Sequence, residues 1–585
     1  MKSYQDLKAC LNSHIPYPAN IPVAYILGDT GSGKSTFIRQ LLGTTSHSFP
    51  STRRIRTTVA PTEYVISPNV PLRATFILKS ASEILRHLEE ILEDAITSHF
   101  EKSLRGPIDE NDLVAALGES ADQRFRLRYI TGDERLLEAA QAIGQDILPN
   151  LAHLIGQAEL SSQSRGPIIE WELKRSLNSE FMAVRDRLNG VVLTRIREVC
   201  SWLSDEPIQE VAEINGDGND IPGFIDKVKE FLGTENSISP IVERARISGN
   251  LRAPWLPSDM EFIVIDSEGI GHNLQDQTLS GRHLDHFYDA DAILLIDDGS
   301  KAFVGQAKNA LRAIIENGYS PKLFLIFTHL DQVDGDGVGR AKQVQEVFRA
   351  LRNAEQALRQ QGGMLSTNDV PVSLLGEMNK QQPDAESQNE ILRTLSQIRE
   401  KHNHFAGQFI APVYNYNGLA EHLSRASHDF RECWDQYLNG DPPLRRPWQS
   451  VKAFNKRMCW GEEEYQDMKP VAQLHQSLLK NLEDFLSRPD RWSQPIGSSM
   501  QESCLNTLKQ EISRSLLELI RGAIVTRQYA QWEEGMEFVG DGSTTKRSKL
   551  IFEIICNCAP QLTDEHHLAF ADETRGLIQE CINKC

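Results

Sequence analysis

Apolar residues along this chain occur in two patterns, short uninterrupted runs and longer segments with helical spacing. The runs have the length of buried strands, and they occupy residues 21–27, 261–265, 292–296, 323–327 and 409–413. Those at 292–296 and 323–327 are each followed by polar sequence that can form a helix, as a parallel sheet with crossover helices requires. The pattern therefore predicts an α/β domain in which helices flank a mostly parallel sheet.

The longer segments have apolar residues three and four positions apart, which is typical of amphipathic helices. These segments are 81–100, 134–155 and 170–203. Sequences typical of helix starts lie at 107–110 and 221–223. We expect a bundle that packs its apolar stripes internally, and a stripe exposed for a partner or a membrane is the alternative.

The first apolar run leads into a glycine-rich segment and then into the helix-like sequence 36–42. Strand, glycine loop and helix in this order predict a phosphate-binding loop, because glycines let backbone N–H groups turn inward at a helix N-terminus. We expect Lys34 to reach the β- and γ-phosphates of a nucleotide and the Ser35 hydroxyl to ligate Mg²⁺. The predicted nucleotide contacts in this segment are Gly28, Asp29, Thr30, Gly31, Ser32, Gly33, Lys34, Ser35 and Thr36.

Two other runs end in residues that suit the same nucleotide. The run 261–265 is followed by Asp266-Ser267-Glu268-Gly269, an Asp-x-x-Gly arrangement in which the carboxylate holds Mg²⁺ and the glycine N–H senses the γ-phosphate. The run 323–327 ends in Thr328-His329-Leu330-Asp331. An Asp carboxylate accepts from both N1–H and N2–H of guanine, and adenine has no such donor pair. The segment therefore predicts GTP, and an ordinary strand-to-helix cap is the alternative.

The last run, 409–413, precedes Tyr414-Asn415-Tyr416-Asn417. A loop at this place in such a domain packs on the base, so we expect Asn415 to contact the nucleotide.

On these motifs, the chain resembles the dynamin-like large GTPases over residues 24–413. Residues 56–64, Arg-Thr-Thr-Val-Ala-Pro-Thr-Glu-Tyr, are similar to the switch I signature of that family. Residues 242–248 and 255–257 resemble the strand before its nucleotide-sensing loop, and 284–296, with Asp-Ala-Asp-Ala at 289–292, resembles the helix and strand after it.

The resemblance implies that Thr57 or Thr58 supplies a switch I hydroxyl that closes over Mg²⁺ and positions the attacking water, and Thr58 is favoured. The implied catalytic residues are then Lys34, Thr58, Asp266 and Gly269, and the implied metal ligands are Ser35, Thr58 and Asp266. The chain departs from the family at Thr30, Gly31, Ser267 and Glu268, and Ile270 stands where small GTPases have a water-orienting Gln. We expect slow hydrolysis that self-association or a partner accelerates.

The same reasoning divides the chain into five parts. They are an N-terminal helix (1–20), a first GTPase part (21–79), a helical insertion (80–241), a second GTPase part (242–418) and a helical C-terminal domain (419–585). The insertion separates the two switch segments, which makes it a candidate lever. Breaks in the C-terminal domain are expected at 439–443, 489–497 and 540–542.

Two polar clusters in the C-terminal domain allow more than one interpretation. The basic, aromatic stretch 445–460 is interpreted as a solvated helix face with core Trp residues, rather than as a phosphate-binding surface. Cys556, Cys558 and Cys581 are interpreted as buried thiols, because their spacing with His566 and His567 matches no common zinc knuckle.

Composition narrows the class of protein further. The 585 residues are too many for one core, and 40% hydrophobic with 24% charged residues is typical of a soluble protein. No run approaches the roughly 18 apolar residues of a membrane span. A net charge of −19 disfavours nucleic acid as a partner, and nine scattered cysteines indicate reduced thiols. We expect a cytoplasmic protein, with peripheral membrane attachment as the alternative.

The predicted function is Mg²⁺-dependent GTP hydrolysis that drives movement or assembly of helical arms, as in dynamin-like proteins. The expected partners are GTP and GDP, and a second copy of the chain bound through the GTPase domain. The alternative is a regulatory switch or scaffold that binds a protein partner through its helical regions, without membrane remodelling.

Overall fold

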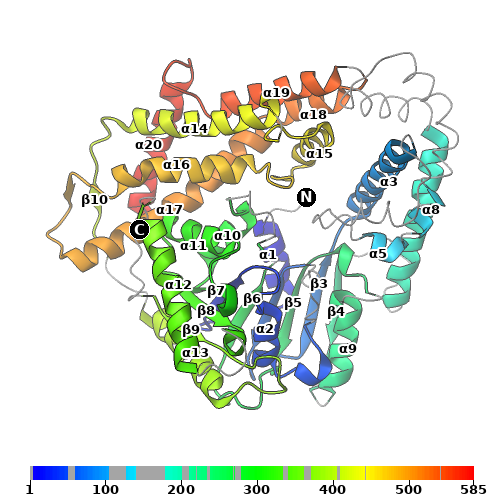
Figure 1. Cartoon of the computed structure of the whole chain (residues 1–585), viewed down its shortest axis with the longest axis vertical. Helices are drawn as coiled ribbons and strands as arrows, with labels where there is room; N and C mark the ends of the chain where they lie inside the picture. The colour runs from blue at the N-terminus through cyan, green and yellow to red at the C-terminus, as the bar shows by residue number, and fades with distance from the viewer. Residues whose placement is uncertain are drawn as a thin grey trace.

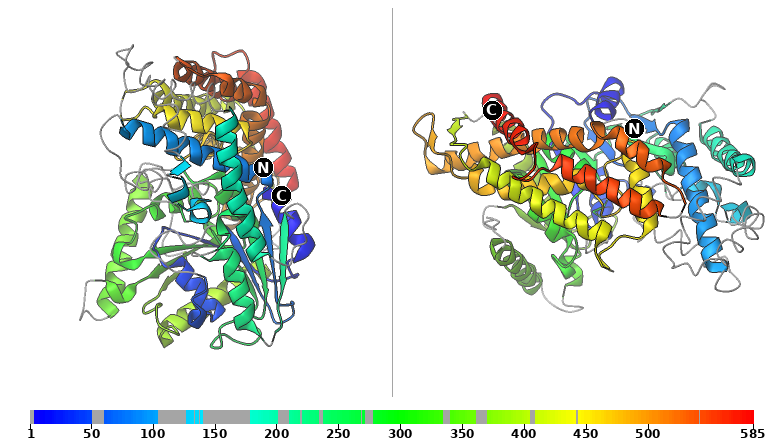
Figure 2. Two further views of the ribbon diagram at one scale, coloured as in Figure 1. Left: turned by 90° about the vertical axis from the view of Figure 1, so that its right-hand side faces the viewer. Right: turned by 90° about the horizontal axis from the view of Figure 1, so that it is seen from above.

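The computed structural model places a sheet domain beside a layer of C-terminal helices (Figure 1). It describes residues 4–50, 60–103, 127–132, 134–136, 138–139, 178–200, 210–218, 220–233, 237–267, 269–270, 278–333, 340–360, 370–404, 409–441, 443–540 and 542–585. In Figure 2 the C-terminal helices, coloured yellow to red, lie above the sheet domain in the left view and in front of it in the right view, which looks down from above. No helix within these ranges has both the length and the apolar character needed to cross a bilayer.

The main sheet of the described chain has nine strands in the order β4-β3-β5-β2-β6-β1-β7-β8-β9. Strands β6, β1, β7, β8 and β9 run parallel, β2 is antiparallel to β6, and β3 is antiparallel to both of its neighbours. The strands are β1 Val23–Leu27, β2 Thr62–Ile66, β3 Arg73–Leu78, β4 Val211–Asn215, β5 Val242–Gly249, β6 Phe262–Asp266, β7 Ala292–Asp298, β8 Leu323–Thr328 and β9 Val372–Leu374. A mixed sheet with flanking helices and a helical C-terminal region agrees with the predicted fold class.

Helices cover both faces of this sheet, which is why its central strands are apolar without interruption. They are α1 Tyr4–His14, α2 Lys34–Leu42, α9 Ile221–Leu232, α10 Gly281–Asp289, α11 Ala307–Glu316, α12 Arg340–Gln360 and α13 Ala385–His404. In β1, Ala24 and Ile26 face one core, whereas Tyr25 and Leu27 face another. The second core continues into the C-terminal helices and includes Trp434 and Trp532.

Four of the five predicted strands are confirmed as β1, β6, β7 and β8, but the fifth is not part of the main sheet. Residues 412–413 form β10 (Pro412–Val413), which pairs antiparallel with β11 (Arg491–Trp492) in a separate two-stranded sheet. The edge position beside β8 belongs to β9 instead. The N–H of Leu325 donates to the Pro371 carbonyl, and the N–H of Leu375 donates to the Phe327 carbonyl, so the edge of β8 is already paired.

The predicted helical insertion is helical only in part. Its described helices include α3 Ala81–Ser103, α5 Arg128–Thr131, α8 Asn178–Val199 and α9, which packs on the sheet. The buried stripe of α3 includes Ile84, Leu88 and Ile91, as the apolar spacing predicted. The end of the segment, however, returns to the sheet as β4, which pairs with β3. The helix start at 221–223 is confirmed as the start of α9, whereas 107–110 and most of 134–155 lie outside the described residues.

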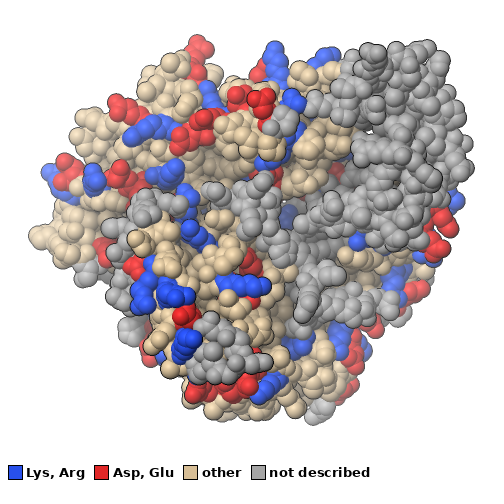
Figure 3. All heavy atoms as spheres, in the orientation of Figure 1, with Lys and Arg blue, Asp and Glu red and all other residues tan. Residues whose placement is uncertain are grey.

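Each of the three predicted breaks separates two of the C-terminal helices, residues 419–585, and unpredicted breaks lie at 460–469 and 559–566. The helices are α14 Leu419–Asn439, α15 Trp448–Cys459, α16 Pro470–Leu486, α17 Ser498–Arg521, α18 Tyr529–Glu537, α19 Ser543–Cys558 and α20 His567–Lys584, with a π-helical turn at Gly522–Thr526. Cys558 and Cys581 are buried, as predicted, whereas Cys556 is only partly buried. Burial raises the pKa of Cys558 to about 12. On the described part of the face in Figure 3, basic and acidic side chains are interspersed.

The contacts of the basic stretch 445–460 differ from both interpretations of the sequence. Three of its cations bind carboxylates of the insertion helix α3, and Arg446 binds Asp467. Lys452 and Lys456 contact Glu93 at 3.1 and 2.6 Å, and Arg457 contacts Glu90 at 2.6 Å. Arg457 is 1% exposed, so it is neither a solvated residue nor a surface for phosphates.

Candidate functional site

The glycine-rich segment forms a tight turn between β1 and α2. Gly28 lies so close to β7 that a Cβ built on it would be 2.1 Å from the Ile296 carbonyl oxygen. Gly33 has a φ of +92°, and its Cβ would be 3.0 Å from Thr328 Oγ1. These two glycines are therefore required by close packing against the neighbouring strands, and at Gly33 also by the left-handed backbone.

Lys34 is the first residue of α2, and its side chain turns back into the curve of the loop. Its Nζ donates to the carbonyl oxygens of Gly28 and Asp29 at 2.7 and 2.8 Å. The residue is 7% exposed. An ammonium held here lies beside the N-terminus of α2, where the helix dipole also favours an anion.

The Asp-x-x-Gly segment folds onto this loop. Asp266 ends β6 and lies opposite Ile26 of β1 in the sheet register, two residues before Gly28. A Cβ on Gly269 would be 3.4 Å from Lys34 Nζ and 3.1 Å from Thr30 Oγ1. The N–H of Ile270 donates to the Gly28 carbonyl at 3.3 Å. Lys34 and Gly269, which the sequence analysis assigned separately to the same phosphates, thus lie close together in the structure.

The segment 328–331 joins the same edge of the sheet. Thr328 Oγ1 donates to the Ser32 carbonyl at 2.7 Å. His329 adopts a left-handed backbone with a φ of +54°, and its Nδ1 lies 3.1 Å from Thr328 Oγ1. Asp331 is exposed, and its Oδ1 accepts from the N–H of Glu377 at 2.9 Å.

Asn415 is not brought to this edge. It lies after β10 and lines a hollow of about 330 Å³ on the C-terminal side with His422, Asp484, Phe485, Arg488 and Asp490. The loop after β9 lies beside Asp331 instead, because the Leu330 N–H donates to the Leu375 carbonyl and Glu377 donates to Asp331. The apolar residues at 370–375 signalled this strand, but β9 itself is only three residues long.

Sequence reasoning also missed a buried carboxyl group beside the glycine loop. Asp297, at the end of β7, is 4% exposed and accepts from the N–H groups of Asp298 and Phe303 at 2.9 and 2.7 Å. Burial raises its pKa to about 7. The following loop supports the glycine loop directly, because the N–H of Gln306 donates to Asp29 Oδ2 at 2.9 Å. The sequence signal for Asp297 was its position directly after the predicted parallel strand 292–296.

The described donor set at this edge suits Mg²⁺, which prefers oxygen ligands. Ser35 lies in the first turn of α2, and Asp266, at 1% exposure, ends the strand next to β1. Within the described residues, Oγ atoms of Thr30, Ser32 and Ser267 are buried without a hydrogen-bond partner. Buried hydroxyls of this kind suit a bound polar ligand. Thr57, Thr58 and Glu268 lie outside the described residues.

Comparisons with known proteins give limited similarity. No family model matches the chain, and no curated protein matches it. One similar solved structure is of an oligomerised bacterial dynamin pair, described as a mechanism for long-range sensing and tethering of membranes. It shares 8% identity with a TM-score of 0.31, over 99% of this chain and 73% of that chain. A second structure of such a pair shares 11% identity with a TM-score of 0.30, over 100% and 76%. These values are too low to assign the chain to a family.

Proposed function

We propose that this chain binds guanine nucleotides with Mg²⁺, hydrolyses GTP slowly, and couples the nucleotide state to its helical regions in a dynamin-like manner. One observation carries the proposal: four segments distant in sequence converge at one edge of the sheet. Lys34 approaches Gly269, Thr328 binds the Ser32 carbonyl, and Asp331 binds the Glu377 N–H.

The glycine loop and Lys34 are proposed to hold the phosphates. The left-handed backbone at Gly31 and Gly33 shapes the loop so that N–H groups can face an anion. Lys34 Nζ, now bonded to two carbonyl oxygens of the loop, exchanges these acceptors for phosphate oxygens. A charge-assisted bond to phosphate is stronger than one to a neutral carbonyl, which favours the exchange.

Asp331 is proposed to select the base. A carboxylate has several acceptor sites on its two oxygens, so the bond from Glu377 orients the group while it still accepts from guanine. Thr328 ties this loop to the phosphate loop, and the spacing between base and phosphates is thereby set by the strands. His329 and the loop after β9 complete the walls of this proposed base site.

Ser35, Asp266 and, by resemblance, Thr58 are the proposed ligands of Mg²⁺. When bound, the ion neutralises phosphate charge during hydrolysis. Thr58 is proposed to position the attacking water, because the Ile270 side chain has no polar group for that task. We therefore expect slow turnover by the single chain and faster turnover when two GTPase domains associate.

A regulatory switch is the second candidate function. It is favoured by the continuous core between the sheet and the C-terminal helices, which includes Phe287 of α10 and Leu517 of α17. A nucleotide-dependent shift of α10 would change the position of α17 through this core, and a protein partner could recognise that change. Co-sedimentation with liposomes, with and without a GTP analogue, separates the candidates: nucleotide-dependent sedimentation supports the dynamin-like function, and its absence supports the switch.

Fluorescent GTP and GDP titrations of the wild-type protein and of Lys34→Ala test the proposal. We expect wild type to bind and Lys34→Ala to lose binding and phosphate release while keeping its circular dichroism spectrum. Lys549→Ala is the control, because Lys549 is 80% exposed on α19. Phosphate release per molecule is then measured over a wide protein concentration range. Wild-type turnover in Lys34→Ala contradicts the phosphate site, and constant specific activity contradicts activation by self-association.

A further inference from the structure

Three successive glutamates between α15 and α16 each bind a different element. Glu462 Oε1 lies 3.0 Å from Arg457 NH1 on α15. Glu463 pairs with Arg521 at the end of α17. Glu464 accepts from Ser280 Oγ, at the start of α10, at 2.9 Å. We call residues 462–464 the glutamate junction.

The junction contacts α10 at its first turn. Ser280 caps this helix, since its Oγ accepts from the Arg282 N–H at 3.3 Å. Gly281 lies against the junction, because a Cβ there would be 2.9 Å from Glu463 Oε2. A larger residue at 281 would therefore force the Glu463 carboxylate to shift.

Arg521 of α17 also joins α10 to the junction. Its NH2 lies 3.1 Å from Asp285 Oδ2 on α10 and 3.2 Å from Glu463 Oε2. Burial raises the pKa of Asp285 to about 6, and the arginine opposes this shift. Arg521 thus holds two carboxyl groups that would otherwise repel each other.

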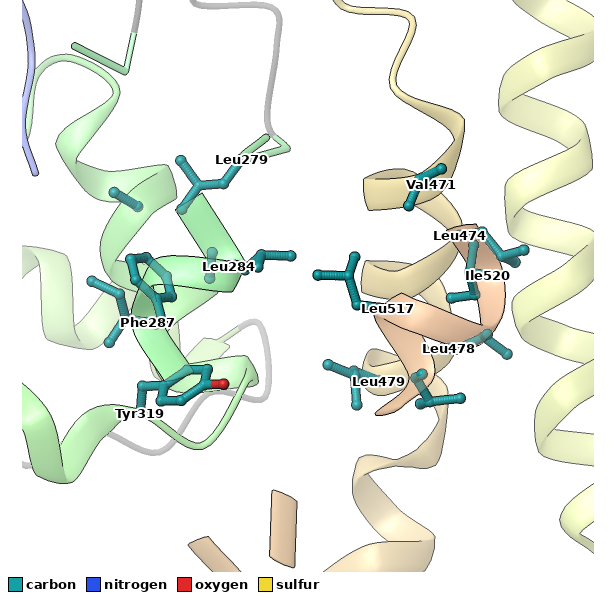
Figure 4. Packing of buried hydrophobic residues seen from close by; sticks show 14 of the residues in the cluster. Leu279, Leu284, Phe287, Tyr319, Val471, Leu474, Leu478, Leu479, Leu517 and Ile520 are labelled. Carbon is teal, nitrogen blue, oxygen red and sulfur yellow. The ribbon is translucent and has the colours of Figure 1, made fainter. Parts of the chain in front are cut away.

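Polar and apolar contacts extend this attachment along α10. Lys469 Nζ donates to the Thr278 carbonyl at 3.0 Å, just before the helix, and Tyr288 OH donates to Glu511 on α17. Figure 4 shows Leu284 directed toward Leu517 of α17. Since packed cores transmit displacement rather than absorb it, α10 and α17 are expected to move together.

The junction also reaches the insertion. Arg457 binds Glu462 and, with its NH2, Glu90 of α3 at 2.6 Å. Lys452 and Lys456 bind Glu93, and they outweigh the effect of burial, so that the pKa of Glu93 lies below its usual range. The junction therefore contacts α10 directly and the insertion helix α3 through Arg457 of α15.

We propose that the glutamate junction couples the nucleotide site to both the C-terminal helices and the insertion. The inference rests on the proposed function, because α10 follows the Asp-x-x-Gly segment whose Gly269 approaches Lys34. A movement of that segment displaces the first turn of α10, and this turn is fixed to Glu463 and Glu464. The displacement then reaches α17 through Arg521 and α3 through Arg457.

Hydrogen exchange with and without a non-hydrolysable GTP analogue tests the coupling. In wild type we expect the analogue to change exchange in α10, in residues 460–469 and in α3. In Arg521→Ala and in the isosteric Glu463→Gln, the change in α10 persists and the change at 460–469 is reduced, because the contacts of Glu464 and Lys469 with the start of α10 remain. Lys509→Ala is the matched control on α17, because Lys509 pairs with Glu483 inside the C-terminal helices, and it retains the wild-type pattern.

The outcomes separate the coupling from the nucleotide proposal. If fluorescence titration shows no binding of the analogue to wild type, the proposed function itself is wrong. If wild type binds but exchange at 460–469 does not respond, or responds equally in Arg521→Ala and Glu463→Gln, the coupling is wrong while nucleotide binding stands. Glu463→Gln preserves side-chain shape, so it decides the question even where Arg521→Ala fails to fold.

Discussion

Replacing Gly33 by alanine tests whether the glycine loop and the 328–331 loop must touch. The added Cβ would lie 3.0 Å from Thr328 Oγ1 and 3.1 Å from Thr328 Cγ2, at a φ of +92°. Thr328 has little room to yield, because its Oγ1 already donates to the Ser32 carbonyl at 2.7 Å. Gly31 is the natural control: its φ is +86°, but nothing lies within 4 Å of its added Cβ.

The comparison separates backbone strain from contact. An alanine at positive φ costs about 1–2 kcal/mol at either position. The contact with Thr328 adds about 1–3 kcal/mol at Gly33 alone, as overpacking does elsewhere. In the free variant the loop can relax to relieve the contact, and nucleotide binding must then restore its original shape. The added cost at Gly33 therefore lowers the nucleotide affinity. Gly33→Ala should then bind GTP about 5- to 150-fold more weakly than Gly31→Ala.

The assay is titration of a fluorescent GDP or GTP analogue into wild type and both variants under one set of Mg²⁺ and salt conditions. Unfolding of each variant is followed separately, so that loss of affinity is not confused with loss of fold. Equal affinities for Gly33→Ala and Gly31→Ala would refute the reasoning, since the contact with Thr328 would then have no bearing on the site.

Three further predictions concern carboxyl groups of the site. Asp266→Ala should weaken Mg²⁺-dependent binding of GTP more than of GDP, because the ion's γ-phosphate side depends on it; equal losses in both titrations contradict this. Asp331→Asn places an amide donor against guanine N2–H, which costs roughly 1–3 kcal/mol per unpaired group. The variant should therefore prefer XTP, because its base has a carbonyl at that position. A competition assay in which the variant still favours GTP would show that residues 328–331 only cap the strand. Burial raises the pKa of Asp297 to about 7 from about 4 in the unfolded chain, so the folded state binds the extra proton. The contribution of Asp297 to the stability of the folded state is present below pH 4 and is lost as pH rises through 7, by at most about 4 kcal/mol. Hydrogen-exchange protection of residues 297–306, corrected for intrinsic rates, should fall over this range. Constant protection would contradict the raised pKa.

Contiguous patterns in the sequence predicted the part of the fold nearest the site. Uninterrupted apolar runs at 261–265 and 292–296 became β6 and β7, because a strand covered on both faces needs apolar residues at every position. The glycine loop was predictable for a different reason. Strand, glycine-rich segment and helix follow one another in the chain, so the loop is recognised from contiguous residues. The need for glycine at 28 and 33, by contrast, comes from Ile296 and Thr328 on neighbouring strands.

Asn415 and Glu377 show where local patterns stopped being sufficient. The run 409–413 has the composition of a strand, yet its partner is β11, nearly eighty residues later in the chain. The three residues of β9 are too few to show any periodicity, and their pairing with β8 depends on the whole sheet being assembled. For the same reason β4 was not distinguished from the helices before it.

The sequence by itself determined the strands of the sheet centre, the glycine loop, and the residue types proposed to bind phosphate, base and Mg²⁺, since each depends on neighbours along the chain. The tertiary structure alone decided which loop lies beside Asp331, which carboxyl is buried beside Asp29, and that Arg457 binds Glu90 rather than solvent. The partners in these contacts lie between 46 and 367 residues apart along the chain, and a single charged residue in a sequence carries no record of its partner. Their formation depends on the packing of helices around the shared core.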